Sequence, residues 1–537
     1  MSDASLAHPE SVTKVEDSLS TPDVETTMAI RGRTTLGAIL LTMTVTLAMM
    51  VNSFNITSVS LAVPTIGRDL SITEASLVWL VAAYSLSSGC LLILFGRVAD
   101  LYGRKKTFLA GTLSLIAFTI GCSFAQDGLT LAILRGFQGI GAAATIPASL
   151  GIIAHSFPPS HARSVAFATF AAGAPLGSAL GTILGGVITQ LASGETWRAD
   201  FWLSAGLTFL CLLGGMFSID KDKPSEEKDR RIDWPGAFLV TASLVLISFV
   251  LNQGEVAPNR WATPYIIGCL VTGVVLMVIF LVWQHYLEKA LAKPTGSASP
   301  LTPPPIMKLS LWKKSNGMLA ALMCISFLNF ASFLAWFYWI QLYYQDFLLL
   351  TPILTMVRML PMFVTGVTCN VNHGAHSPSN ALVTGTTVTS IACLLFAVIV
   401  PSAPYWAFGF PAAICSVFGA DFVFAGGTMF VAKTVEPHEQ SLAGALFQTM
   451  AQLGQALGVT ITTIVFNQVA ATHAKVGDTT PPLKAYQSAQ WTAFGFAILA
   501  TILGVLCLRG AGIAGDQTES DIPPPKTESD HSTGTIP

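Results

Sequence analysis

Between two long apolar segments the chain reads GRVADLYGRKK at residues 96–106. The flanking segments, residues 76–95 and 107–124, carry almost no ionisable side chains, so neither would dissolve as a surface helix. Five of these eleven residues are charged, in a chain whose residues are only 11% charged, and they must contact water. Their cationic excess predicts that the stretch faces the cytosol. Its two glycines allow a tight reversal of the chain.

The composition of the whole chain is that of a membrane protein. Of its 537 residues 52% are hydrophobic, and the mean hydropathy is +0.61, whereas a soluble surface needs far more charge. No basic cluster is interleaved with aromatic residues, which argues against nucleic-acid binding. The nine cysteines have no metal-ligand spacing, and no nucleophile has a nearby base. We therefore expect no metal, no cofactor and no enzymatic activity.

Apolar stretches long enough to cross a bilayer recur along the chain. The sequence offers about fourteen of them, with about twelve as the alternative, because a span needs roughly 20 apolar residues. Lysine and arginine are concentrated in every second connection, which places both termini in the cytosol. The sequence thus predicts an all-α polytopic membrane protein.

The connections divide the predicted spans into blocks. We expect disordered, polar cytosolic tails at residues 1–36 and 510–537, and the first tail lacks the apolar core of a signal peptide. Between the tails the sequence predicts a six-helix half at 37–218, a cytosolic linker at 219–233, two inserted helices at 234–287, a second linker at 288–315 and a second six-helix half at 316–509.

The span expected at residues 129–155 contains an arginine. Arg135 in hydrocarbon is costly, so it should face a cavity or a polar partner rather than lipid. Gln138 lies about one helical turn away and could line the same polar track. A structural role, with bonds to carbonyls of a neighbouring helix, and a role in coupling or substrate binding both remain open.

A carboxylate lies deep in the span expected at residues 404–432. Asp421 is a candidate proton or cation site, because a carboxylate in hydrocarbon can bind and release protons; a structural aspartate bonded to backbone groups is the alternative. Arg358, in the span expected at 352–371, could be its counter-charge. Snorkelling of Arg358 to the interface is the interpretation we favour.

Two further spans carry ordered sets of side chains. Gln448, Gln452 and Gln455 share one helix face, which should line a cavity or bond across helices.

Residues 327–344 are rich in aromatic side chains, and their outer end is predicted to form an interfacial belt. Part of this set could instead hold an amine by cation–π contact.

Glycines recur at intervals of four in the span expected at residues 163–191. Missing side chains along one face let another helix approach closely, either as static packing or as a surface that slides or hinges. The row consists of Gly173, Gly177, Gly181 and Gly185, followed by Gly186.

The opening stretch resembles the signature loop between the second and third spans of the major facilitator superfamily. Arg135, Gln138, Gly139 and Gly141 match the span-4 motif of that family. The number of spans and the glycine row are similar to its drug:proton antiporter branch, which has two inserted central helices. Residues 51–64 and 197–201 resemble the fungal aminotriazole-resistance and low-affinity ammonium transporter subgroup. The resemblance covers nearly all of residues 37–509.

Two positions depart from the antiporter pattern. The span-5 motif usually has a proline after its third glycine, whereas Gly181 is followed here by Thr182. The span-1 motif usually carries an aspartate at the position of Asn55. Both departures concern proton antiport and leave the expected fold unchanged.

The resemblance implies a secondary transporter that exports small organic molecules, such as drugs or secondary metabolites, by alternating access. Protons are the expected coupling ion, and the lack of a phosphate-binding loop argues against ATP as the driver. A uniporter-like facilitator of a small solute such as ammonium, and a nutrient transceptor, are the alternatives. We expect a monomer in the lipid bilayer, in the plasma membrane rather than the vacuole.

Two sets of residues are the candidates for this function. The transport and coupling candidates are Arg135, Gln138, Asp421, Asn55, Gln448, Gln452 and Gln455. The candidate cytosolic gate loop contains Gly96, Arg97, Asp100, Gly103, Arg104 and Lys105.

Overall fold

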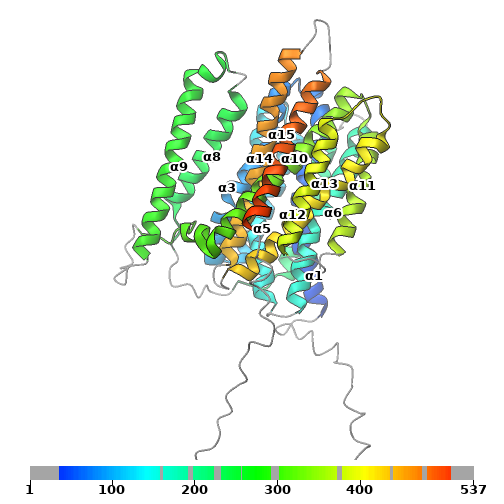
Figure 1. Ribbon diagram of the computed structural model, residues 1–537. Coiled ribbons are helices and arrows are strands. Elements are labelled where there is room, and N and C mark those ends of the chain that lie inside the picture. Colours follow the sequence, from blue (N-terminus) through cyan, green and yellow to red (C-terminus); the bar gives the residue numbers. More distant parts are fainter. Residues whose placement is uncertain are drawn as a thin grey trace, which may run out of the picture. The chain divides into compact units, whose positions relative to one another are not determined.

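The structure, a computed structural model, describes residues 35–157, 161–191, 197–222, 231–254, 257–291, 302–371, 378–435, 440–473 and 481–508. Within these ranges all regular secondary structure is helical, as predicted (Figure 1). The helices fall into two units. The first unit is Met1–Leu244 with Ala298–Ile306 and Thr351–Met356, and the second is Val245–Ser297, Met307–Leu350 and Val357–Pro537. Most of both predicted tails and parts of both linkers lie outside the described residues.

The helices of the first unit follow the apolar runs of its sequence. They are α1 (Thr35–Asp69), α2 (Glu74–Leu77), α3 (Trp79–Tyr102), α4 (Arg104–Ser123), α5 (Gly128–Ser156), α6 (His161–Leu191) and α7 (Arg198–Ser218). Helix α1 packs along α6, α5 packs against both α3 and α4, and α7 packs against α1 and α4. This arrangement surrounds α5 and buries its polar side chains.

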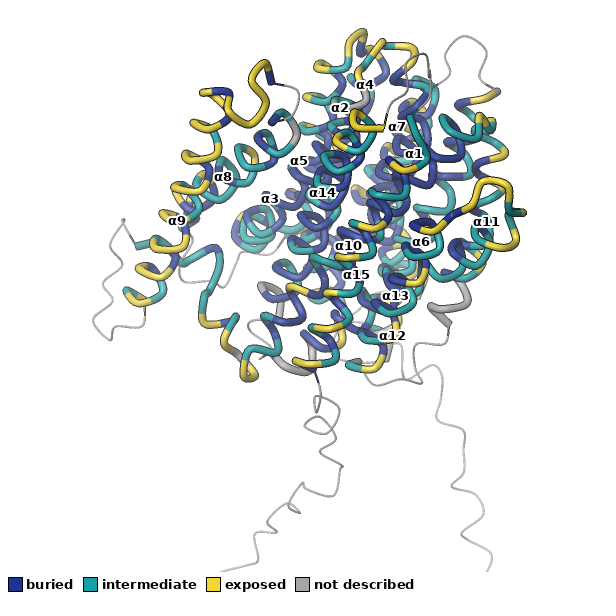
Figure 2. The backbone as a smooth tube through the Cα atoms, turned by 45° about the horizontal axis from the view of Figure 1, so that its top comes forward, coloured by how far each residue is buried: buried dark blue, intermediate teal, exposed yellow. Residues whose placement is uncertain are grey.

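The predicted inserted helices are α8 (Trp234–Gln253) and α9 (Pro264–Leu291), joined through the short turn η2 (Arg260–Ala262). The start of α8 packs on the end of α3, where Ile232 and Ala237 contact Leu94 and Leu101. Figure 2 shows mostly exposed positions along α9. Exposed apolar side chains such as Val282, at 64% exposure, are expected of a helix that faces lipid.

The second unit contains η3 (Leu309–Gly317), α10 (Met318–Leu342), η4 (Tyr343–Phe347), α11 (Pro352–Val371), α12 (Pro378–Ala397), α13 (Tyr405–Thr434), α14 (Gln440–His473) and α15 (Leu483–Cys507), although α11 begins in the first unit. Helix α10 packs along α14, and α12 packs against α13 and α15. A Cβ atom on Gly454 of α14 would meet the carbonyl of Phe327 in α10. This close helix pair repeats the one that α6 forms with α1 in the first unit.

Thirteen helices in the described residues are long and apolar enough to cross a membrane, and Pro352–Gly366 is a shorter apolar helix. The polytopic all-α fold is therefore confirmed. The exact number of spans and the side on which the termini lie stay predictions.

The charged stretch at residues 96–106 differs from the expected loop. Helix α3 continues to Tyr102 and α4 begins at Arg104, so Gly103 alone lies between them. Gly103 has a φ of 117°, which residues with a side chain rarely adopt. Charged residues indicate where the chain meets water, but they do not end a helix. The expected loop is therefore almost entirely helical.

The interfacial aromatic belt predicted at the end of α10 is wrong. Trp336, Trp339 and Tyr343 are at most 2% exposed. The ring of Trp339 stacks on Phe466 of α14 with 4.1 Å between centroids, and Tyr343 meets Tyr486 of α15 edge to face. Aromatic side chains occur all around α10, and its neighbours cover them, so the residue type alone did not distinguish a belt from a packed core.

Candidate functional site

Arg135 of α5 is completely buried and has several partners. Its Nε donates to the carbonyl of Leu80 over 2.9 Å, its Nη2 to the carbonyl of Asn55 over 3.1 Å, and its Nη1 to Gln138 Oε1 over 2.7 Å. The guanidinium carbon lies 4.6 Å from the centre of the Tyr84 ring. The arginine is thus held by α1, α3 and its own helix instead of facing lipid.

Gln138 and Asn55 extend this arrangement to two more helices. Gln138 Nε2 donates to Asn55 Oδ1 over 2.9 Å and to Thr119 Oγ1 of α4 over 2.7 Å. Asn55 Oδ1 also accepts a 2.7 Å bond from the hydroxyl of Ser204 in α7, and its Nδ2 donates to the carbonyl of Val51. Asn55 therefore joins α1, α5 and α7.

These side chains form one buried set, which we call the Arg135 network. Tyr84, whose ring lies over Arg135, donates a 2.7 Å bond from its hydroxyl to Asn52 Oδ1. All members are less than 5% exposed. The network consists of Asn52, Asn55, Tyr84, Thr119, Arg135, Gln138 and Ser204. Its near-complete pairing supports the structural interpretation of Arg135, and a role of Arg135 in coupling or substrate binding stays a prediction.

A carboxylate that the sequence interpretation missed lies beside the network. Asp200, in the first turn of α7, is 2% exposed and interacts electrostatically with Arg135. No hydrogen bond of standard geometry reaches its Oδ1 within the described part of the chain, although the hydroxyl of Ser58 in α1 is near enough to interact with the carboxylate. A buried carboxylate whose neighbouring donor is only weakly placed is costly. The sequence WRADF at residues 197–201 contains this acid directly before an apolar run, which could have indicated a buried carboxylate. We used that stretch only for its resemblance to a transporter subgroup.

Asp421 lies in α13 of the second unit, whereas Arg135 belongs to the first. Its side chain is half-buried, and Asn329 of α10 donates to the carbonyl of Gly419, two residues earlier. Arg358 does not pair with Asp421. Its guanidinium lies over the rings of Tyr344 and Tyr405.

The three glutamines lie on α14, which packs against α10. Gln448 and Gln452 are 8% and 2% exposed, and Gln455 is half-buried. They are therefore withdrawn from the surface of the unit. A role in substrate binding stays a prediction.

The glycine row on α6 is a close contact with α1. A Cβ atom on Gly177 would collide with the carbonyl of Met50, and one on Gly173 would lie 2.7 Å from the carbonyl of Thr46. Gly181 and Gly185 approach Phe54 and Ser58 in the same way, and Gly186 approaches Leu61. The row therefore serves close packing, and a sliding or hinging role stays a prediction.

The candidate gate residues are tied to one another and to α5. Arg104 Nη2 lies 2.9 Å from Asp100 Oδ1, one helical turn earlier, across the junction of α3 and α4. Gly96 approaches Pro147 of α5, and Gly151 of α5 approaches the side chain of Arg104. Arg97 lies in the same last turns of α3.

The junction is also anchored to the end of α7. Lys105 Nζ donates to the carbonyls of Met216 and Ile219. The carboxylate of Asp222, in the connection after α7, accepts the backbone amides of Lys105 and Lys106 over 2.8 and 3.0 Å. Asp222 thereby satisfies amides at the start of α4 that have no partner within the helix.

The comparisons with known proteins agree with this architecture. The family profile of the Major Facilitator Superfamily matches residues 45–255. The multidrug transporter mfsC of Aspergillus fumigatus is 28% identical, over 88% of this chain and 87% of that protein. The low affinity ammonium transporter of Saccharomyces cerevisiae is 27% identical, over 80% of this chain and 81% of that protein.

A solved structure has the same fold. The POT family transporter PepTSo has a TM-score of 0.62 at 14% identity, over 87% of this chain and 97% of that one. The family profile, the relatives that cover most of the chain and the helical architecture point the same way. The chain thus has the fold of the major facilitator superfamily and is similar over most of its length to transporters of that family.

Proposed function

We propose that this transporter exports small organic molecules by secondary active transport and alternating access, with protons as the coupling ion. The similarity to the multidrug transporter mfsC supports export of such molecules. The observation that carries the proton coupling is the burial of Asp200 in the first turn of α7, with the hydroxyl of Ser58 as its neighbouring donor and Arg135 within electrostatic range.

Asp200 can change its charge state, whereas Arg135 cannot. The arginine remains charged in proteins, and its bonds to Leu80, Asn55 and Gln138 hold it in place. Asp200 can be ionised, in which case it compensates the arginine, or protonated, in which case the network carries an uncompensated positive charge. A change in hydration or packing at the start of α7 would shift this balance, so proton binding and conformation would be linked.

The neutral Asn55 fits this assignment. Its amide is occupied by Gln138, Ser204 and Val51, so the position where the family motif has an aspartate carries no titratable group here. We assign proton binding to Asp200, and Asp421 is the second candidate carboxylate.

Proteoliposomes test the proposal, with ethidium as the probe. An imposed pH gradient should drive ethidium accumulation by the wild type. Asp200→Asn should abolish this accumulation while ethidium exchange at equal pH continues, because the substitution removes the titratable group and retains the size. Asp421→Asn tests the second candidate in the same assay: if it abolishes the accumulation and Asp200→Asn does not, the proton is bound at Asp421. Accumulation by Asp200→Asn with unchanged pH dependence would overturn the role of Asp200.

A facilitator of ammonium is the second candidate. The neutral Asn55, Thr182 in place of the motif proline, and the similarity to a yeast ammonium transporter favour it. Saturable downhill entry of radiolabelled methylammonium at equal pH, together with no gradient-driven accumulation of ethidium, would decide for this candidate.

A further inference from the structure

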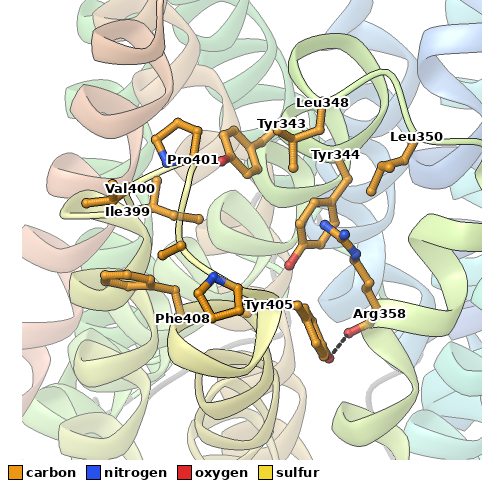
Figure 3. Close-up of a pocket in the computed structure, with 13 residues that line it drawn as sticks. Tyr343, Tyr344, Leu348, Leu350, Arg358, Ile399, Val400, Pro401, Tyr405 and Phe408 are labelled. Carbon is orange, nitrogen blue, oxygen red and sulfur yellow. Dashed lines mark hydrogen bonds between the residues drawn. The ribbon is translucent and has the colours of Figure 1, made fainter.

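A pocket of about 200 Å³ lies within the second unit, where the end of α10, the turn η4, α11 and the start of α13 meet (Figure 3). Tyr343, Tyr344 and Arg358 line one side of it. Ile399, Val400 and Phe408 provide apolar surface on the other side. All residues that line this pocket belong to the second unit, whereas the Arg135 network belongs to the first.

Arg358 is fixed in this pocket by two tyrosines. Its guanidinium carbon lies 5.1 Å from the ring centre of Tyr344 and 5.5 Å from that of Tyr405. Tyr405 also donates a 2.6 Å bond from its hydroxyl to the backbone carbonyl of Arg358, shown as the dashed line in Figure 3. The two rings hold the cation through their faces, which do not occupy its N–H donors.

Among the residues that the structure describes, no acidic side chain pairs with Arg358. Within the described residues its guanidinium forms no hydrogen bond and no ion pair. Cation–π contacts contribute only about 0.5–2 kcal/mol each, and the five N–H donors of a guanidinium match a carboxylate or a phosphate. An anion in the pocket would supply the missing partner.

The backbone beside the pocket is irregular in a way that helix propensity does not explain. Residues Tyr343–Phe347 form a π-helical turn, and Leu349 just after it has a φ of 54°. π turns are rare and frequently lie at functional sites, and a leucine with positive φ is strained. Figure 3 shows both tyrosines of this turn beside the pocket. The turn thus places the ring of Tyr344 over Arg358.

We infer that this pocket binds a small organic carboxylate, with its anionic group at Arg358 and its apolar body against Ile399, Val400 and Phe408. The apolar lining favours an organic acid over an inorganic anion. The volume of about 200 Å³ is below the roughly 300–1,000 Å³ typical of pockets for drug-sized ligands, so the acid is small.

Calorimetric titration of the full-length protein in nanodiscs of zwitterionic lipid tests this inference. Benzoate is the probe, and neutral benzamide and inorganic phosphate are the comparators. Benzoate should bind more tightly than either. Arg358→Gln should weaken benzoate binding about tenfold or more, because a hydrogen bond to a charged group contributes about 1.5–3 kcal/mol.

Lys484→Gln is the matched control. Lys484 is an exposed cation at the start of α15, two residues before Tyr486, whose ring packs on Tyr343. Its removal should leave benzoate binding unchanged. If Arg358→Gln does not fold, Arg358→Lys keeps the charge and loses the planar donor fork, and should weaken benzoate binding several-fold.

Several results would overturn the inference. Benzoate binding that is equal in the wild type and Arg358→Gln would exclude Arg358, and benzamide binding as tight as benzoate would exclude recognition of charge. Phosphate binding as tight as benzoate would exclude an organic ligand, and no heat from millimolar benzoate would exclude the site. Because the readout is binding and not transport, the proposed export function can fail or hold independently.

Discussion

The side-chain amides of Gln138 and Asn55 are joined by a 2.9 Å hydrogen bond between α5 and α1. Gln138 also accepts a bond from Arg135, and Asn55 also accepts one from Ser204. This one contact therefore connects a buried cation to three helices of the first unit. Removing either amide would leave several buried groups without a partner, and this is costly in a membrane interior.

Gln138→Leu should destabilise the first unit by about 2–4 kcal/mol, because Arg135, Asn55 and Thr119 each lose a hydrogen-bond partner. Thermal unfolding in detergent should show a lower midpoint. Ile133→Leu, at an exposed position of the same helix, is the control and should leave the midpoint unchanged. Equal midpoints for Gln138→Leu and the wild type would contradict the network's structural role.

Gly177→Ala should destabilise the protein by about 1–3 kcal/mol, because the new methyl group collides with the backbone of Met50 in α1. Gly206→Ala in α7 is the matched control, since no atom lies within 4 Å of a Cβ built there. The higher helix propensity of alanine should make Gly206→Ala neutral or stabilising by up to about 1 kcal/mol. The same unfolding assay compares them, and a tolerated Gly177→Ala would show that α6 and α1 are not in close contact.

Asp222→Ala should expose the start of α4, because the carboxylate accepts the backbone amides of Lys105 and Lys106. The loss of such a capping group costs about 0.5–2 kcal/mol. Hydrogen exchange, followed by mass spectrometry, should become faster at these two amides. Asp222→Asn keeps one oxygen acceptor and should give an intermediate rate, whereas exchange that is unchanged in both variants would argue that the contact does not persist in solution.

Asp127 should give stability a pH dependence at the start of α5. The hydroxyl and the amide of Thr130 donate to its carboxylate, which holds the pKa of Asp127 below its ordinary value of 3.8. A carboxyl with a lowered folded-state pKa stabilises the folded state above the ordinary value and loses this effect as the pH falls through the lower value. Asp127→Ala should therefore lower the unfolding midpoint at neutral pH, and the difference from the wild type should disappear in acid.

Asp127→Ser provides the control for that titration. Serine retains an acceptor for the Thr130 amide but does not ionise in this range, so the difference in midpoint between Asp127→Ser and Asp127→Ala should not depend on pH. A difference between Asp127→Ala and the wild type that persists undiminished below the folded-state pKa would contradict the assignment.

Several features of the site could be predicted from single residues. An arginine within an apolar run must find polar partners, and Arg135 has them. Glycines at intervals of four predict a close helix contact, and Gly173 and Gly177 form one with α1. Asp200 was missed because it lies at the start of a span, where an acid usually meets water. The aromatic residues of α10 were misassigned because a belt and a core use the same residue types.

The sequence by itself determined that the chain is an all-α membrane protein and where most of its helices lie, because hydrophobicity and charge along the chain decide which segments enter a bilayer. Only the tertiary structure decided that Asn55, Gln138 and Ser204 meet, that Asp200 is buried within electrostatic range of Arg135, and that Arg358 lies against two tyrosines. These contacts join residues from different helices, and their partners depend on how the helices pack and rotate, which no periodicity within one helix specifies.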